Sequence, residues 1–166
     1  MSERADARTE ARAGGRVVAL DLGTRRIGVA YSDRGRTLAS PWGTVTRTGD
    51  AAQDRRAVVE VVGEVEAGTV IVGLPLSLSG RHGPAAQSTL AEVAALRELL
   101  EPLGVTVETH DERFTTIEAQ RSLTAAGRKG KAARSVIDSA AAMVLLQAWL
   151  DAAPAPAPAP PPGDGA

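Results

Sequence analysis

The chain has 166 residues, of which 43% are hydrophobic and 23% are charged, and its formal net charge is −1. This length suits one domain with a sizeable core and leaves little room for a second. Cysteine is absent and only two histidines are present, so disulfides and thiolate metal sites are excluded. Any metal site would depend mainly on carboxylates, which favours Mg²⁺ or Mn²⁺.

The charges are distributed unevenly along the chain. Residues 16–56 carry eight Arg against four Asp, residues 57–109 two Arg against seven Glu, and residues 110–134 six Lys or Arg against three acids. The two basic segments are compatible with a polyanion that approaches one side of the molecule. No apolar run approaches 18 residues, and the N-terminus lacks the apolar part of a signal peptide, so we expect a cytoplasmic protein with no membrane partner.

The first elements form a predicted hairpin. Residues 1–15 lack apolar periodicity and are expected to be a disordered leader. Val17–Leu20 is a short, β-branched apolar run typical of a buried strand, and it ends on Asp21. Gly23 then allows a turn, and Ile27–Tyr31 supplies the second strand. The result is a carboxylate at the end of a buried strand, although an Asp-x-Gly sequence is also an ordinary turn.

The middle of the chain alternates between strands and helices. Asp33 is expected to be a turn acid, and Leu38–Val45 a third strand, at an edge or bulged because it contains Pro and Gly. The charge spacing over Arg55–Ala67, before Gly68, predicts an amphipathic helix. Val70–Leu74 is wholly apolar, as in a central parallel strand.

The remaining elements continue this alternation. We expect a helix over Ala85–Leu100, a strand over Val105–Thr109, a helix from about Thr115 to Ala126, a basic loop over Gly127–Lys131 and an apolar helix over Ser135–Leu150. Residues 152–166 are a Pro-Ala tract and are expected to be a disordered tail. The folded domain is therefore predicted over residues 16–151.

This order of elements predicts an α/β fold. Three hairpin-connected antiparallel strands and two parallel strands that follow helices give a mixed five-stranded sheet with helices on both faces. Sites in such sheets lie at the carboxyl ends of strands. Asp21 and Glu112 both fall at such ends.

Three acids are the candidate catalytic and metal-binding residues: Asp21, Glu112 and Asp138, the last in the first turn of the apolar helix. Carboxylates without imidazole or thiolate suit one or two Mg²⁺ ions, which activate water and stabilise the leaving oxygen in phosphodiester cleavage. Local alternatives stay open. Ser135 and Asp138 have the spacing of a helix capping box. Glu112 could instead pair with a neighbouring arginine, or Asp111 could be the site residue in its place, since adjacent strand residues face opposite ways.

Basic residues close to these acids are the candidate nucleic-acid contacts, since arginine binds phosphate with bidentate geometry. Solvated surface charge is the alternative for each of them. The candidates are Arg25, Arg26, Arg113, Arg128, Lys129 and Lys131.

Four motifs in order resemble the YqgF family of Holliday-junction-resolvase-like, pre-16S ribosomal RNA nucleases. They are Asp21-Leu-Gly-Thr-Arg-Arg-Ile-Gly-Val-Ala, Gly73-Leu-Pro-Leu, Asp111-Glu-Arg-Phe-Thr-Thr and Asp138-Ser-Ala-Ala-Ala. The resemblance implies a ribonuclease H-like fold and a Mg²⁺- or Mn²⁺-dependent nuclease that matures the 5′ end of 16S ribosomal RNA. It places the family's acids on Asp21, Glu112 and Asp138. Related resolvases carry an acid on the fourth strand, which here ends Gly73-Leu-Pro-Leu, so Glu112 must take its place.

Three functions remain open at this stage. The first is the nuclease, whose partner would be precursor ribosomal RNA or the pre-ribosomal small subunit, acting as a monomer or homodimer. The second is a resolvase of four-way DNA, which requires a dimer. The third is a non-catalytic RNA-binding factor in ribosome assembly or transcription.

Overall fold

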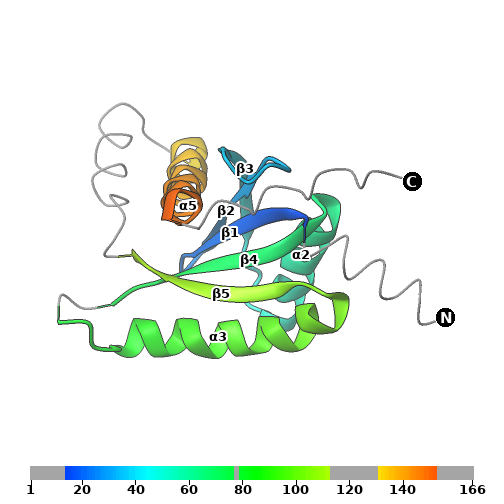
Figure 1. The fold of residues 1–166 in the computed structure, drawn as a ribbon. Helices are drawn as coiled ribbons and strands as arrows, with labels where there is room; N and C mark the ends of the chain where they lie inside the picture. The colour runs from blue at the N-terminus through cyan, green and yellow to red at the C-terminus, as the bar shows by residue number, and fades with distance from the viewer. Residues whose placement is uncertain (1–13, 77–78, 113–130, 153–166) are drawn as a thin grey trace, which may run out of the picture.

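A computed structural model describes residues 14–76, 79–112 and 131–152. They form one five-stranded sheet (Figure 1). Helix α5 (Lys131–Ala152) covers one face, and helices α2 (Ala51–Glu64) and α3 (Pro84–Leu100) cover the other. Most of the predicted leader, the helix over 115–126, most of the basic loop over 127–131 and nearly all of the predicted tail lie outside the described residues.

The strands confirm the predicted mixed sheet. β1 and β2 pair antiparallel, as do β2 and β3, whereas β4 runs parallel to β1 and β5 parallel to β4. The spatial order is β3-β2-β1-β4-β5. Their bounds are β1 Arg16–Leu22, β2 Arg26–Ser32, β3 Ala39–Thr46, β4 Ala67–Leu74 and β5 Thr106–Asp111.

Strand β3 is both an edge strand and irregular, as its Pro and Gly predict. Consecutive residues Val29 and Ala30 of β2 pair with Gly43 and Pro41 of β3, so Trp42 is left over as the extra residue. Gly43 has φ +140°, a conformation that is open to glycine and strained for other residues. An edge position tolerates the missing N–H of proline.

Helix α2, Ala51–Glu64, differs at both ends from the predicted Arg55–Ala67. It begins earlier because the Asp50 side chain accepts hydrogen bonds from the N–H groups of Ala52 and Gln53. It ends earlier, before the expected stop at Gly68, because Glu66 takes the left-handed conformation with φ +57°. Gly68 lies within β4 instead.

The other helices cover both faces of the sheet. α3, Pro84–Leu100, is followed by the short 3₁₀ helix η1, Glu101–Leu103. α5 spans Lys131–Ala152, so it begins four residues before the predicted Ser135. Among the helices of the described residues, none combines the length and apolar character needed to cross a bilayer.

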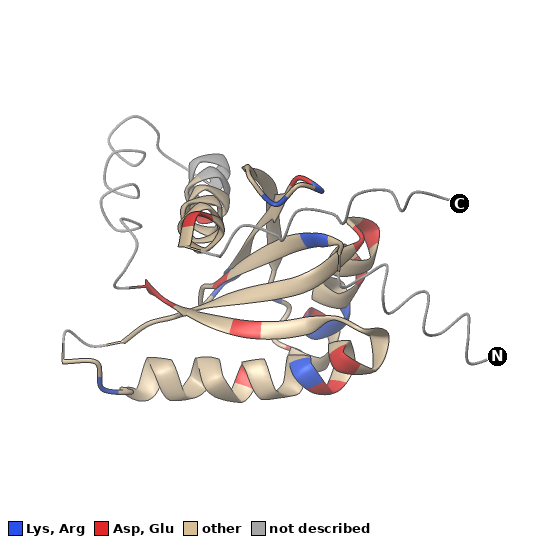
Figure 2. Ribbon diagram, in the orientation of Figure 1, with Lys and Arg blue, Asp and Glu red and all other residues tan. Residues whose placement is uncertain are grey.

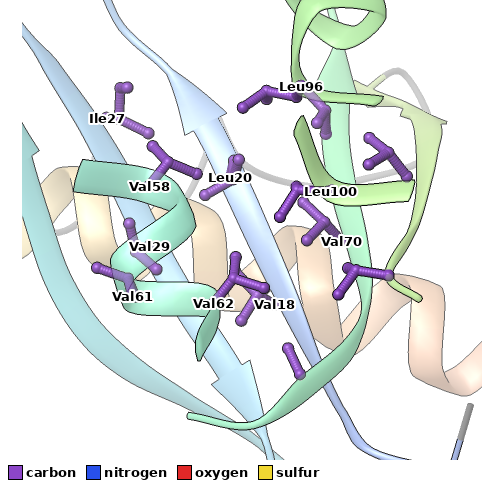
Figure 3. Packing of buried hydrophobic residues seen from close by; sticks show 14 of the residues in the cluster. Val18, Leu20, Ile27, Val29, Val58, Val61, Val62, Val70, Leu96 and Leu100 are labelled. Atoms are coloured by element: carbon purple, nitrogen blue, oxygen red, sulfur yellow. The ribbon is translucent and has the colours of Figure 1, made fainter. Parts of the chain in front are cut away.

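Alternation along the strands divides the core into two layers. Val18, Leu20 and Val70 pack with α2 and α3 in the larger layer (Figure 3). The smaller layer, which we call the α5-side cluster, includes Ala19, Ile71 and residues of α5 such as Leu145, which is fully buried. Burial of one such leucine contributes about 1.5–3 kcal/mol, so α5 docks mainly through its apolar face.

Candidate functional site

Asp21 lies on the face of the sheet that α5 covers. Val17 and Ala19 of β1 belong to the α5-side cluster, and alternation places the Asp21 side chain on the same face. The residue is only 6% exposed. A carboxylate buried to this degree is costly unless its surroundings compensate the charge, so its position next to an apolar layer marks it as the centre of the candidate site.

A glycine on one side of Asp21 admits Asp138. Gly28 of β2 is the register partner of Asp21. A Cβ atom built on Gly28 would lie 2.6 Å from the backbone carbonyl carbon of Asp138 and 3.3 Å from its Cβ, so α5 packs directly against the bare strand. This contact brings Asp138, far away in sequence, to the strand next to Asp21.

A second glycine, on the other side of Asp21, admits Glu112. Leu20 pairs with Val72 in the parallel ladder, so the next residues, Asp21 and Gly73, lie side by side. A Cβ atom on Gly73 would lie 2.6 Å from Oε1 of Glu112, whose side chain therefore extends over this strand. The two glycines thus place Asp138 and Glu112 on opposite sides of Asp21 at the same end of the sheet.

Glu112 and Asp111, the two alternatives at the end of β5, lie on different faces of the sheet. His110 pairs with Gly73 on β5, so its side chain is on the α5 side, and alternation turns Asp111 to the opposite face. Glu112 follows directly after the strand and reaches back to the α5 side over Gly73. Figure 2 shows the acidic end of β5, next to which Glu112 lies.

Asp138 is bound by a cation of the chain itself. Nε of Arg26 donates to Oδ2 of Asp138 at 2.9 Å, and both side chains are largely shielded from solvent. The capping-box interpretation is wrong, because α5 begins at Lys131 and Asp138 lies about two turns further on. Asp138, an acid in a largely apolar helix, therefore faces Arg26.

The three acids do not form a closed cage in the structure. Within the described residues, no group of three or more His, Asp or Glu side chains is arranged to hold a metal ion. The oxygen donors and the two glycine openings nevertheless suit a small hard cation, since carboxylates are the ligands that Mg²⁺ and Mn²⁺ prefer. The hydrogen bond from Arg26 occupies an oxygen of Asp138 that a metal ion would otherwise use.

His110 is a neighbour of this site that the sequence analysis did not select. It lies beside Gly73 on the α5 side, and burial lowers the pKa of its imidazole, against the opposing effect of Asp111. Its Nε2 is buried, with no hydrogen-bond partner within the described part of the chain. Burial therefore favours the neutral imidazole. Continuing the strand alternation past Thr109 is the sequence signal that would have placed His110 here.

The predicted basic residues lie in different surroundings, and three of them fall outside the described residues. Arg25 is exposed at the β1–β2 turn, and Arg26 is the partner of Asp138. Lys131 is the first residue of α5. Arg113, Arg128 and Lys129 lie outside the described residues. Asp33, separately, is the expected turn acid.

The turn assignment of Asp33 is confirmed by its contacts. Its carboxylate accepts hydrogen bonds from the N–H groups of Leu38 and Thr37 and from the hydroxyl of Thr37. The same bonds hold the pKa of Asp33 below its usual value of 3.8. It lies at the far end of the β2–β3 hairpin from Asp21 and plays no part in the site.

Arg47, which the sequence analysis missed, ties the two loops beside the site together. Its backbone N–H donates to the carbonyl of Arg25 at 2.9 Å, and its Nε donates to the carbonyl of Gly23 at 2.7 Å. Arg47 directly follows β3, so it is remote from the Gly-Thr turn in sequence and next to it in space. Only the strand pairing reveals this proximity.

Asp54 anchors the loop that follows Arg47. The backbone N–H and the hydroxyl of Thr48 both donate to Oδ1 of Asp54, at 2.9 and 2.8 Å. These hydrogen bonds, first the backbone one, and the charge of Arg47 lower the pKa of Asp54 below its usual 3.8. The ionised form of Asp54 is thus the one that the fold stabilises.

We expect Asp54→Asn to be less stable than the wild type at pH 7, with a difference that shrinks in acid. Because the folded-state pKa is the lower one, the unfolded chain binds more protons between the two values, and the contribution of Asp54 is lost as pH falls through the folded-state pKa. Urea unfolding of both proteins between pH 7 and pH 3 checks this. A difference in unfolding free energy that stays constant below pH 3.8 would contradict it.

Sequence comparison places this chain among nucleases. A profile of the RuvX family, described as Holliday junction resolvase, matches residues 15–152. A protein of Leifsonia xyli subsp. xyli, named "Putative pre-16S rRNA nuclease", is 46% identical over 133 residues, which make up 80% of this chain and 83% of that protein. A protein of Mycobacterium ulcerans with the same name is 47% identical over 137 residues, or 82% and 79% of the two chains.

Solved structures confirm the predicted ribonuclease H-like fold. RuvC of Thermus thermophilus, solved in complex with a Holliday junction substrate, matches 81% of this chain and 92% of its own with a TM-score of 0.51. A second structure of that RuvC matches with a TM-score of 0.50. Both are 15% identical to this chain, so the likeness establishes the fold.

Proposed function

Since this chain belongs to the RuvX family of Holliday junction resolvases and is a nuclease, we propose that it cleaves precursor 16S ribosomal RNA with a divalent metal ion at Asp21. The observation that carries the proposal is the placement of three acids at one end of the sheet. Asp21 is buried there, and glycines on both neighbouring strands leave room for Asp138 and Glu112.

In this proposal Asp21, Glu112 and Asp138 would hold Mg²⁺ or Mn²⁺, which would supply water activation and charge stabilisation at the leaving oxygen. Asp21 lies within a strand, so its position is the most rigid of the three acids. Glu112 reaches the site by a flexible side chain from the end of β5. Asp138 is presented by a rigid helix but shares its carboxylate with Arg26.

Arg26 is assigned a positioning role on this view. Its contact fixes the rotamer of Asp138 and keeps a positive charge next to an acid that would otherwise repel the other two. Arg25, Arg113, Arg128, Lys129 and Lys131 remain the predicted contacts to the nucleic-acid backbone. Ribosomal RNA is matured where ribosomes are assembled, so the proposal also places the protein in the cytoplasm.

A four-way DNA junction is the second candidate substrate, because the family description names Holliday junction resolvases. Resolution of a junction needs two strands to be cut at related positions, so this function requires a homodimer. Precursor RNA places no such demand and is compatible with a monomer or a homodimer. A monomeric mass in solution would therefore argue against junction resolution, whereas a dimeric mass is compatible with both substrates.

The decisive experiment is a cleavage assay with purified full-length protein on two substrates, a precursor 16S ribosomal RNA fragment and a synthetic four-way DNA junction. We expect the RNA to be cut in Mg²⁺ or Mn²⁺ and to stay intact in EDTA. If only the junction is cut, the substrate is four-way DNA and not precursor RNA. Binding of RNA with no cutting in either metal would refute the catalytic role and favour an assembly factor.

A further inference from the structure

A basic pocket lies beside the candidate site, on the side of the hairpin turn that faces α2. Its volume is about 520 Å³, and it is open to solvent between the β1–β2 turn and the segment that connects β3 to α2. The residues that matter for its chemistry are Thr24, Arg25, Arg26, Thr46, Arg47 and Asp54.

The charge of this pocket is positive even after its internal pairs are counted. Three arginines line it against one carboxylate, that of Asp54, whose Oδ1 already accepts two hydrogen bonds from Thr48. Arg26 is balanced by Asp138. Arg25 is exposed and, within the described residues, has no ion pair or side-chain hydrogen bond, which leaves Arg25 and Arg47 as the cations available to a ligand.

The guanidinium of Arg47 is held in place and still has donors to offer. Its Nε bonds the carbonyl of Gly23, the one side-chain hydrogen bond that it makes within the described part of the chain. A guanidinium carries five N–H donors in a fixed fork, so the terminal nitrogens remain for a ligand. Its backbone N–H also binds the carbonyl of Arg25, so the backbones of the two arginines are held together at this turn. A guanidinium fixed in this way, with a second arginine next to it, suits a phosphate.

A second pocket next to it lacks this character. It has a volume of about 370 Å³ and shares Arg47, but its other charged residue is Glu92. Both oxygens of Glu92 accept from Arg55 at 2.9 Å, so that pair neutralises itself. The second pocket thus offers a phosphate Arg47 alone, whereas the first offers Arg25 and Arg47, so phosphate binding is expected in the first pocket.

We propose that the pocket formed by Thr24, Arg25, Thr46 and Arg47 binds a backbone phosphate of the nucleic-acid substrate that is separate from the phosphate at the acids. Thr24 follows Asp21 by three residues, a span of at most about 11 Å of extended chain, so the phosphate would be a near neighbour along the same substrate. Only this location relative to the cleaved bond rests on the proposed function; phosphate binding itself does not.

The test is equilibrium binding of a fluorescent RNA hairpin to full-length protein in EDTA, repeated over a range of KCl concentrations. Arg25→Ala and Arg47→Ala should each weaken binding about tenfold, as expected for the loss of a charged hydrogen bond. Each should also lower the slope of log affinity against log salt by about 0.9, the contribution of one phosphate contact. Arg47→Lys should keep most of the slope because it keeps the charge.

Arg34→Ala is the matched control, since Arg34 is an exposed arginine in the turn at the opposite end of the β2–β3 hairpin, where it pairs with Glu66. Its salt slope should equal that of the wild type. Unchanged slopes in Arg25→Ala and Arg47→Ala, or an equal decrease in Arg34→Ala, would overturn the proposal. This assay measures binding and the cleavage assay measures catalysis, so either proposal can fail while the other stands.

Discussion

Asp21→Asn is expected to lose metal-dependent cleavage by more than about 100-fold, beyond the 10–100-fold typical of losing an outer-shell partner. Asn keeps the size of Asp and one acceptor oxygen but removes the negative charge. At a buried position between two glycines, no other carboxylate on the same strand can take over. The measurement is single-turnover cleavage of the precursor RNA fragment in Mg²⁺, with binding in EDTA recorded in parallel.

Asp151→Asn serves as the control for this variant, since Asp151 is an exposed acid near the end of α5 and the substitution removes the same charge. It should cleave at the wild-type rate. Binding of RNA by Asp21→Asn should be retained or slightly tighter, because one negative charge near the backbone is gone. Wild-type cleavage by a folded Asp21→Asn protein would show that this acid is not part of the catalytic site.

The sheet could be predicted because its central strands are recognisable from local sequence patterns. Val17–Leu20 and Val70–Leu74 are apolar runs too short for helices, and both are central strands. The ends of α2 were not predictable in the same way. Asp50 caps that helix before any apolar periodicity begins, and Glu66 adopts a left-handed conformation that sequence patterns assign to glycine.

The candidate site was predictable in its acids and less so in what surrounds them. Asp21, Glu112 and Asp138 each follow from strand ends or from a charge in an apolar helix. Their partners depend on long-range packing: Arg26 meets Asp138 across 112 residues of sequence. Gly28 and Arg47 matter because of the segments that pack against them. The local sequence does not predict these contacts.

Gly28→Ala is expected to destabilise the protein by about 3 kcal/mol. It should also abolish cleavage, because Asp138 would move away from Asp21. The new methyl group would lie 2.6 Å from the backbone carbonyl carbon of Asp138. Backbone cannot rotate away as a side chain can, so α5 must shift outward as a unit and give up part of its packing against the sheet. Overpacking of a core costs about 1–3 kcal/mol and occasionally more. For a chain of this size that corresponds to a melting temperature lower by about 6–12 °C.

Two glycine variants separate the causes of that loss. Gly63→Ala, in an open position on α2, should raise stability by about 0.4–1 kcal/mol because alanine limits the unfolded chain. Gly73→Ala places its methyl group against the flexible end of Glu112 and a terminal carbon of Leu145, so stability should fall less than in Gly28→Ala while cleavage still declines. Thermal unfolding and cleavage rates of the three variants test this order. If Gly28→Ala melts with the wild type, the contact between Gly28 and Asp138 does not position α5, and the approach of Asp138 to Asp21 must have another origin.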